Sequence, residues 1–179
     1  MHRKSLVGFR TACERMWGKT GYESLCRDLP ADVRDRTAGM HPLPDWNALE
    51  DLIAWHLAVW NGPAKRDEKI MAQLIDRSVD HGFGYVKRFL LSVSTPQSLA
   101  PRVVALWREE FSTGRLEASL LEPRSVHLTL HDHPYVAIPL MRLVMAEVYR
   151  YVVSLTKAKH VSAVHAVRGS ALVVVLRWA

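Results

Sequence analysis

The hydrophobic pattern of this 179-residue chain changes its period near Arg115, and this change limits the folds that the chain can adopt. Before Arg115, apolar residues recur about every 3.6 positions, which is typical of amphipathic helices. After it, apolar and polar residues alternate, as they do from Val126 to Leu130, and this is typical of half-buried strands. One later segment, Pro139 to Thr156, returns to the helical period. The order of helices, two strands, a long helix and two strands predicts an α+β fold with a four-stranded antiparallel sheet.

The expected strands are short segments in the last third of the chain. They run from Arg115 to Leu121, Ser125 to His131, His160 to Val167 and Ala171 to Trp178. The last of them is apolar at odd and even positions alike, which is typical of a central strand with both faces covered. The helix from Pro139 to Thr156 has only a narrow polar stripe, so we expect it to pack on this sheet.

The part before the sheet is expected to be helical. Its pattern predicts helices at Ser5 to Met16, Tyr22 to Asp28, Ala31 to Arg36 and Ala64 to Val93. The residues Thr95 and Pro96 then predict the start of a further helix, because a hydroxyl cap is followed by proline in the first turn.

A helix with a candidate functional histidine is expected in the middle of this part. Asp45 is a suitable N-cap, and Asn61-Gly62-Pro63 would end the helix. Its apolar face would contain Trp46, Leu49, Leu52, Ile53, Leu57 and Trp60. His56 lies near the middle of that face, where it could be an axial ligand or a proton shuttle. The simpler interpretation is a buried, hydrogen-bonded structural histidine.

Length and composition favour one α+β domain over residues 1–179, with helices to about residue 114 and the sheet from about 115 to 179. The longest clean apolar run near the end, Ala171 to Leu176, is far shorter than the roughly 20 residues of a membrane span. The apolar stretch behind the N-terminus is shorter than the core of a signal peptide. We therefore expect a cytoplasmic protein without membrane contact, with Cys13 and Cys26 as reduced thiols.

The net charge of +6 raises the question of an acidic partner. The basic pairs Lys65-Arg66 and Lys87-Arg88, and the lysines at 157 and 159, lie in different segments. Nucleic-acid-binding proteins usually gather such residues on one face or along one helix. We therefore do not expect nucleic acid as the partner and keep a basic nucleic-acid-associated protein as a secondary alternative.

Three histidines form the sharpest local cluster in the sequence. If one strand carried His127, His131 and His133, all three would share one face. His131 and His133 would then lie about 7 Å apart and could hold one metal ion. The simpler interpretation is a polar strand face followed by a turn, because the spacing matches no known ligand motif. We therefore predict no metal site.

Sequence motifs of catalysis are missing. The chain has no P-loop, no G-x-G-x-x-G after a strand, no H-E-x-x-H and no G-x-S-x-G. Cys13 and Cys26 lack a C-x-x-C spacing. We predict no catalytic residues and favour a protein that is not an enzyme.

Short segments along the chain resemble a family of myxobacterial proteins of similar length. They are Arg77 to Gly84, Ser94 to Pro96, Leu106 to Arg108 and Val174 to Trp178. In its order of elements that family resembles the superfamily of heme-NO-binding domains, 4-vinyl-reductase-type domains and TRAPP subunits. The resemblance covers nearly the whole chain and implies a ligand-binding domain.

The resemblance also implies residues that this chain lacks. Heme-NO-binding domains carry an axial histidine on the helix before the first strand pair, but Thr95 to Thr113 contains no histidine, and Trp107 lies on its apolar face. They also carry a Tyr-x-Ser-x-Arg motif, where this chain has Leu128 to Pro134. The zinc cysteines of some vinyl-reductase-type domains are missing beyond Cys26. We therefore expect no heme and no other cofactor.

These observations favour a non-enzymatic sensor or adaptor module that binds a small apolar ligand or a protein partner. The alternative is a heme- or metal-binding protein or enzyme that uses His56 or the His131/His133 pair. A homodimer is also expected, because apolar surface on the last strand and the helix before it would need cover, and two-fold assemblies are the commonest.

Overall fold

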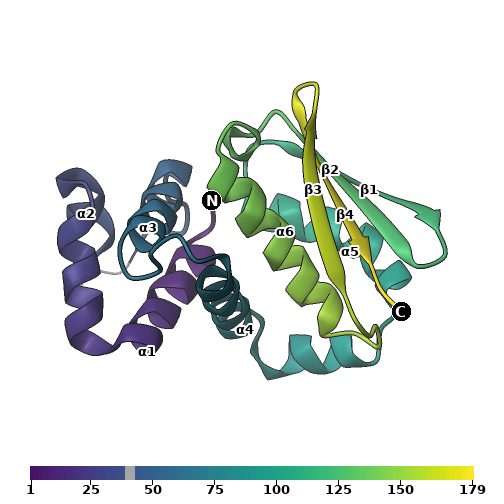
Figure 1. Cartoon of the computed structure of the whole chain (residues 1–179), viewed down its shortest axis with the longest axis horizontal. Coiled ribbons are helices and arrows are strands. Elements are labelled where there is room, and N and C mark those ends of the chain that lie inside the picture. Colours follow the sequence, from purple (N-terminus) through teal and green to yellow (C-terminus); the bar gives the residue numbers. More distant parts are fainter. Residues whose placement is uncertain (39–42) are drawn as a thin grey trace. The chain divides into compact units, whose positions relative to one another are not determined.

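The structure, a computed structural model, describes residues 1–38 and 43–179, without the side chains of residues 83–89 and 121. The chain divides into two units, Met1–Gly82 and Phe83–Ala179 (Figure 1). The boundary falls inside the helix α4 (Glu68–Ser92) and not near residue 114, where the sequence pattern changes. The reason is that the helix α5 (Pro96–Glu110) packs against the first strands of the sheet.

The first unit contains α1 (Arg3–Asp28), α2 (Ala31–Thr37), α3 (Leu49–Asn61) and the first part of α4. Within α1 the backbone leaves helical geometry at Gly18, with φ 68° and ψ 179°. Glycine adopts positive φ without steric cost, so it allows this break. The two segments on either side agree with the two helices predicted from the sequence.

Close helix packing in this unit depends on Gly8 of α1. A Cβ atom at this position would lie 2.9 Å from the backbone oxygen of Ser78 in α4. Only a residue without a side chain permits this approach. The fully buried side chains of Leu6, Phe9, Trp55, Met71, Leu74 and Ile75 belong to the core of this unit.

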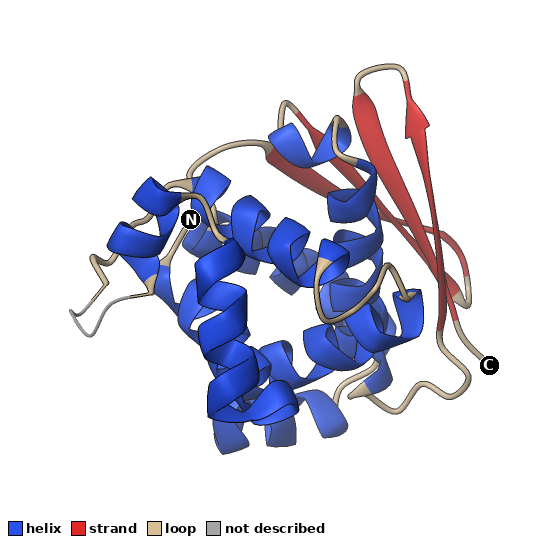
Figure 2. Cartoon of the chain, turned by 60° about the vertical axis from the view of Figure 1, so that its left-hand side comes forward, coloured by secondary structure: helices blue, strands red, loops and turns tan. Residues whose placement is uncertain are grey.

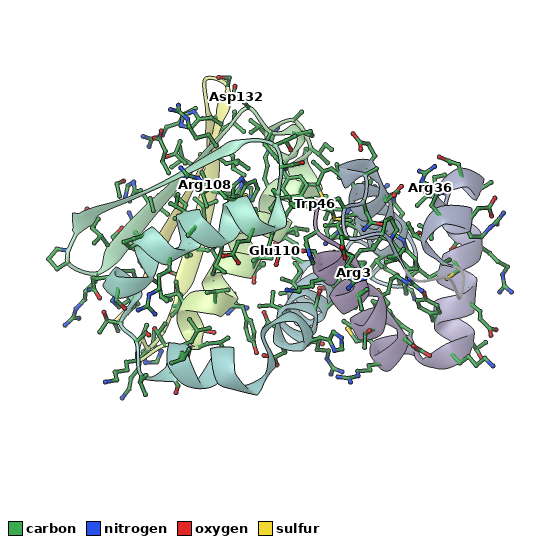
Figure 3. All side chains as sticks on the ribbon, turned by 180° about the vertical axis from the view of Figure 1, so that it is seen from behind. Arg3, Arg36, Trp46, Arg108, Glu110 and Asp132 are labelled. Carbon is green, nitrogen blue, oxygen red and sulfur yellow. The ribbon has the colours of Figure 1, made fainter. Side chains whose placement is uncertain are left out.

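The start of α3 differs from the prediction. Asp45 is not an N-cap, since Ala48 precedes the first helical residue. The backbone there is extended and pairs with the N-terminus, because Arg3 N–H donates to the Asp45 carbonyl at 2.8 Å. Trp46 is therefore off the helix and 49% exposed (Figure 3). These non-local hydrogen bonds replace the additional helical turn that the apolar pattern predicted.

The buried face of α3 also differs in part from the prediction. Leu49, Leu52, Ile53 and His56 are buried as expected. Leu57 is 37% exposed, and Trp55, which lay off the predicted face, is fully buried. For α4, the sequence predicts an apolar stripe of Ile70, Met71, Leu74, Ile75, Val79, Phe83, Val86 and Leu90. Of these, Met71, Leu74 and Ile75 are buried. The stripe positions at 83 and 86 lie outside the described side chains, and the stripe position Leu90 is 51% exposed.

The second unit confirms the predicted α+β architecture. Its strands are β1 (Arg115–Glu122), β2 (Ser125–His131), β3 (Ser162–Arg168) and β4 (Ala171–Arg177). They form one antiparallel sheet in the order β1-β2-β4-β3. Between β2 and β3 the chain forms a short 3-10 helix, η1 (Pro134–Val136), and the helix α6 (Pro139–Ser154).

One face of the sheet is buried against α5 and α6 (Figure 2). The buried side chains are Leu116, Val126, Leu128, Leu130, Leu172, Val174 and Leu176. The strand β4 is central, as predicted. Its second face is less covered than expected, because Val173 and Val175 remain partly exposed. Val164 of the edge strand β3 is 55% exposed, so this outer face is open within the unit.

Within residues 1–38 and 43–179, no helix is both long enough and apolar enough to cross a membrane.

Candidate functional site

The helix α5 precedes the first strand pair, where the family resemblance implies an axial histidine. It begins as predicted, because Thr95 Oγ1 accepts a hydrogen bond from Ser98 N–H at 3.3 Å and Pro96 occupies the first turn. Its buried side chains are Pro96, Leu99, Ala100, Val103 and Trp107. The residues from 96 to 110 include no histidine, cysteine, methionine or tyrosine. These are the protein ligands that commonly hold heme iron, so α5 offers none.

A largely buried aromatic cluster lies between α5 and the segment that follows β2. Its histidine, His133, is in edge-to-face contact with Trp107, with ring centroids 5.0 Å apart and planes at 72°. Tyr135 is in edge-to-face contact with His133 at 4.4 Å. Phe111 stacks on Trp107 at 4.2 Å. These four residues, Trp107, Phe111, His133 and Tyr135, are called the aromatic cluster below.

The backbone after β2 directs His133 into this cluster. The strand ends at His131, and Asp132 (Figure 3) adopts a positive φ of 53°. The alternation of side chains between the two faces of the strand therefore stops before His133. His133 is buried, whereas His131 stays on the strand with its Nε2 atom 3.6 Å from Glu117 Oε2. The structure therefore does not bring His131 and His133 together as a ligand pair.

The hydrogen bonds of His133 determine which ring nitrogen carries the proton. Its Nδ1 atom accepts a hydrogen bond from Tyr135 N–H at 3.3 Å. Burial lowers the pKa of His133 to about 4, so the ring is neutral at pH 7. A neutral imidazole whose Nδ1 accepts carries its proton on Nε2. His133 Nε2 is therefore a donor and does not offer a lone pair to a metal ion.

Two donors in the aromatic cluster lack an acceptor. Within the described residues, neither His133 Nε2 nor Trp107 Nε1 has a hydrogen-bond partner, and both atoms are buried. The indole nitrogen of tryptophan can only donate. The great majority of buried polar side-chain atoms in proteins are paired, so these two require an explanation.

His56 carries its proton on the other ring nitrogen from His133. Its Nδ1 atom lies 2.8 Å from the carbonyl oxygen of Leu52, one helical turn earlier, so Nδ1 carries the proton and Nε2 carries the lone pair. Its ring packs on Phe9 at 4.1 Å. Burial lowers the pKa of His56 to about 4, which keeps the ring neutral. The prediction of a buried, hydrogen-bonded histidine is confirmed, and its tautomer is the one found in histidines that bind metals.

An open pocket of about 400 Å³ lies in the first unit. Its lining consists of Asp28, Pro30, Ala54, Leu57, Ala58, Asn61 and Gly62. The α3 residues in this lining recur at helical spacing on one face, which is not the face of His56. The pocket and His56 are therefore separate features.

The two cysteines and the possible metal-ligand clusters are the remaining candidates from the sequence. Cys13 and Cys26 are both free, as predicted, and burial raises the pKa of each thiol. A thiol with a raised pKa is a poor nucleophile. No group of three or more histidine, cysteine, aspartate or glutamate side chains in the described parts of the chain could hold a metal ion.

The aromatic cluster was not predicted from the sequence. The spacing of Trp107 and Phe111, four residues apart, indicates neighbours on one helix face. Nothing local indicates that His133 and Tyr135 lie against them. That contact depends on the turn at Asp132 and on the packing of α5 against the sheet.

Comparison with known proteins gives matches in structure only. No family profile and no curated protein sequence matches the chain. An H-NOX protein from S. oneidensis in the Fe(II) ligation state matches with a TM-score of 0.71 and 9% identity, covering 100% of this chain and 96% of that one. A mutant of the H-NOX protein from K. algicida, in the unliganded Fe(II) form, gives 0.68 and 8%, covering 100% and 97%. The chain has the H-NOX fold.

A third H-NOX structure extends the comparison to a ligand-bound form. It is described as an oxygen-binding H-NOX domain related to soluble guanylate cyclases and matches with a TM-score of 0.65 and 12% identity, covering 99% of this chain and 95% of that one. These identities establish the fold of the chain and nothing finer. The resemblance to the heme-NO-binding superfamily is thus confirmed as a fold, and the link to a myxobacterial family stays a prediction.

Proposed function

We propose that this protein is a sensor module that binds heme, and that His56 holds the iron. The observation that carries the proposal is the match to H-NOX structures along 99–100% of the chain. The matching structures concern heme distortion, heme redox potential and an oxygen complex, and these are properties of those proteins. The comparisons favour heme over the small apolar ligand that we preferred from the sequence alone.

The chain offers a candidate iron ligand at one position and none at another. The helix α5 offers no axial ligand. His56 is neutral, donates its Nδ1 proton to a backbone carbonyl and keeps the lone pair of Nε2 for iron. Heme bound through one histidine would supply an open coordination position for a gas. The carbonyl of Leu52 would fix the orientation of the ring and raise the basicity of the ligand.

Reconstitution with hemin tests this proposal. We expect the reduced protein to show a Soret band that saturates at one heme per chain. The variant His56→Gly should lose the band and recover it when imidazole is added, since the added imidazole replaces the missing ring. His165→Ala is the matched control, because His165 is exposed on β3. An unchanged Soret band in His56→Gly, or no band in the native protein, would contradict the proposal.

A heme-free sensor is the second candidate. The lack of any axial ligand on α5 favours it. In that case the ligand would be a small molecule or a protein partner, as we expected from the sequence. Native mass spectrometry of protein purified from its own host separates the two candidates, because a retained heme and a retained organic ligand differ in mass.

A further inference from the structure

We propose that the free edge of β3 is a docking site for an extended, acidic segment of a partner protein, which adds a further strand to the sheet. The proposal goes beyond heme binding and does not depend on His56. β3 is an edge strand, because the order of the sheet is β1-β2-β4-β3. It pairs with β4 from Ser162 to Arg168 without a shift in register. Every second residue of such a strand turns its N–H and C=O groups away from its only neighbour.

These outward backbone groups have no partner strand within the described residues. None of the backbone hydrogen bonds that lie outside helices and strands there involves residues 162–168. Every residue of β3 except Ala163 is exposed, and the exposed fraction is 55% for Val164 and 39% for Val167. A row of unpaired strand groups is a template for another strand, and several classes of peptide-binding domain use it in this way.

The two edges of the sheet differ in how they are protected against such pairing. Proteins protect edge strands with charged side chains and bulges. The other edge strand, β1, has the charged residues Arg115, Glu117 and Glu122, and its register with β2 shifts before Glu122. β3 has regular pairing, no proline and a single charged residue, Arg168, at its last position. The edge of β3 is therefore the one that can accept a strand.

The charge around β3 selects an acidic partner. From residue 148 to residue 179 the chain has no aspartate or glutamate. Four exposed cations lie in the same segment: Lys157, Lys159, Arg168 and Arg177. Within the described residues, none of the four forms an ion pair. Arg168 ends β3 and Arg177 lies opposite Ser162 at its start, so cations lie at both ends of the strand. Complementary charge favours one class of partner over another.

Strand geometry defines the size and side chains of the docked segment. Seven residues of β3 at about 3.3 Å each span about 23 Å. Val164 and Ala166 of β3 share the open face with Val173 and Val175 of β4. Apolar β-branched side chains pair well across strands on such a face. The docked segment therefore has about seven residues, with β-branched side chains in the middle and a carboxylate at each end.

A synthetic peptide of this design tests the proposal. It has blocked ends, a glutamate at each end and alternating valine and threonine between them. We expect saturable binding in calorimetry and slower hydrogen exchange at alternate amides of β3, because the peptide pairs with the N–H groups that point away from β4. The same peptide with lysine in place of both glutamates should bind about tenfold less tightly. A version with a central proline should not bind, because proline has no N–H to donate to a strand.

Two variants of the protein test the charge term. Arg168→Glu should weaken binding of the glutamate peptide about fivefold, since it replaces an exposed attraction by a repulsion. Arg115→Glu is the matched control on the opposite edge strand, β1, and should bind as the native protein does. Both arginines are exposed, so both variants should fold.

Four outcomes would overturn the proposal. One is equal binding of the glutamate and lysine peptides, and another is equal loss of affinity in Arg168→Glu and Arg115→Glu. Protection of alternate β3 amides without any peptide would show that a second copy of the chain already occupies the edge. A single-stranded oligonucleotide that binds more tightly than the peptide and displaces it would assign the cations to nucleic acid. None of these measurements needs heme, so their result is independent of the Soret experiment.

Discussion

Buried polar groups are paired in the first unit and partly unpaired in the second. Thr37, Asp51 and His56 each make a hydrogen bond at 2.6–2.8 Å. Within the described residues of the second unit, four buried atoms lack one: Trp107 Nε1, Ser125 Oγ, His131 Nε2 and His133 Nε2. Paired groups stabilise a fold, whereas a buried polar group without a partner carries the cost of its lost hydration. The difference indicates that the buried polar groups of the first unit stabilise its fold, whereas those of the second unit are only partly paired by the described residues.

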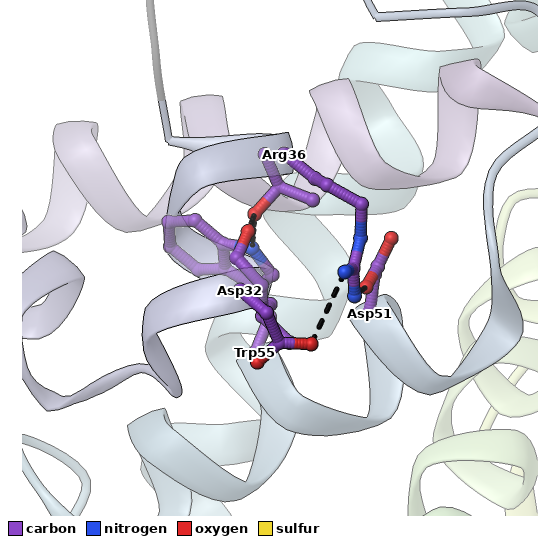
Figure 4. Close-up of polar contacts among 6 residues, drawn as sticks. Asp32, Arg36, Asp51 and Trp55 are labelled. Atoms are coloured by element: carbon purple, nitrogen blue, oxygen red, sulfur yellow. Dashed lines mark hydrogen bonds and ion pairs between the residues drawn. The ribbon is translucent and has the colours of Figure 1, made fainter.

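The contact between α2 and α3 shows how paired buried polar groups stabilise the first unit (Figure 4). The carboxylate of Asp51 is almost fully buried and accepts a hydrogen bond from Arg36 Nη2 at 2.7 Å. Arg36 also donates to Asp32 at 3.1 Å. In the same contact Trp55 Nε1 donates to Thr37 Oγ1 at 2.8 Å, and Thr37 Oγ1 donates to the Val33 carbonyl at 2.6 Å.

The largest expected effect is a loss of stability in mild acid. Burial lowers the pKa of His56 and of His133 to about 4, below the value near 6.5 of an unfolded chain. The unfolded state therefore binds protons more readily between pH 6.5 and 4, so stability is complete above that range and falls as the pH is lowered through it. Each histidine should cost about 2 kcal/mol at pH 5 relative to pH 7.

Urea unfolding at pH 7 and pH 5 measures this effect in each unit. In each of the variants His56→Phe and His133→Phe, the difference in free energy of unfolding between pH 7 and pH 5 should be smaller by the contribution of one histidine. A variant that keeps the full dependence of the native protein would show that its histidine is not buried in the neutral form.

The next largest effect is expected at Asp51. The substitution Asp51→Ala removes a buried acceptor of a charge-assisted hydrogen bond and should lower the free energy of unfolding by about 2 kcal/mol. Asp45→Ala is the control, because Asp45 also pairs with an arginine, Arg3, but is exposed. Exposed ion pairs contribute about 0–1 kcal/mol. Thermal and urea unfolding measure the two losses of free energy of unfolding. Equal losses in the two variants would show that burial of Asp51 gives its hydrogen bond no additional effect on stability.

A matched pair of tryptophan substitutions compares the two units directly. Trp55→Phe and Trp107→Phe remove the same atoms, but only Trp55 loses a hydrogen bond in the free protein. Trp55→Phe should therefore be more destabilising by about 1 kcal/mol. If Trp107→Phe costs as much as Trp55→Phe in urea unfolding, the indole of Trp107 is already paired and the two units do not differ.

The smallest effect on stability is expected at the open face of the sheet. We propose that this face forms a two-fold homodimer, because Val164 is exposed and Val173 and Val175 of β4 are only partly covered. Sedimentation should give twice the chain mass of 20.3 kDa, and Val164→Lys should return the monomer. The monomer itself should change by no more than about 0.5 kcal/mol, as is usual for surface substitutions. A native protein of single-chain mass at tens of micromolar would refute the dimer.

The sequence by itself determined the order and type of the elements. The alternation in β2 predicted its bounds, and Thr95-Pro96 predicted the start of α5, because both signals depend only on residues that are close in the chain. The sequence alone also shows that α5 carries no residue of a type that ligates heme iron, because this conclusion needs only the residues of one helix.

Only the tertiary structure decided where the functional candidates lie. Asp45 lost its predicted role because the extended segment around it pairs with the N-terminus, which is distant in sequence. His133 left the strand face of His131 because Asp132 adopts a positive φ, and it reached Trp107 because α5 packs on the sheet. The tautomers of His56 and His133 likewise follow from hydrogen bonds to backbone atoms. Local periodicity fixes which face a residue occupies within its element, but which groups meet, and which remain unpaired, depends on contacts between elements.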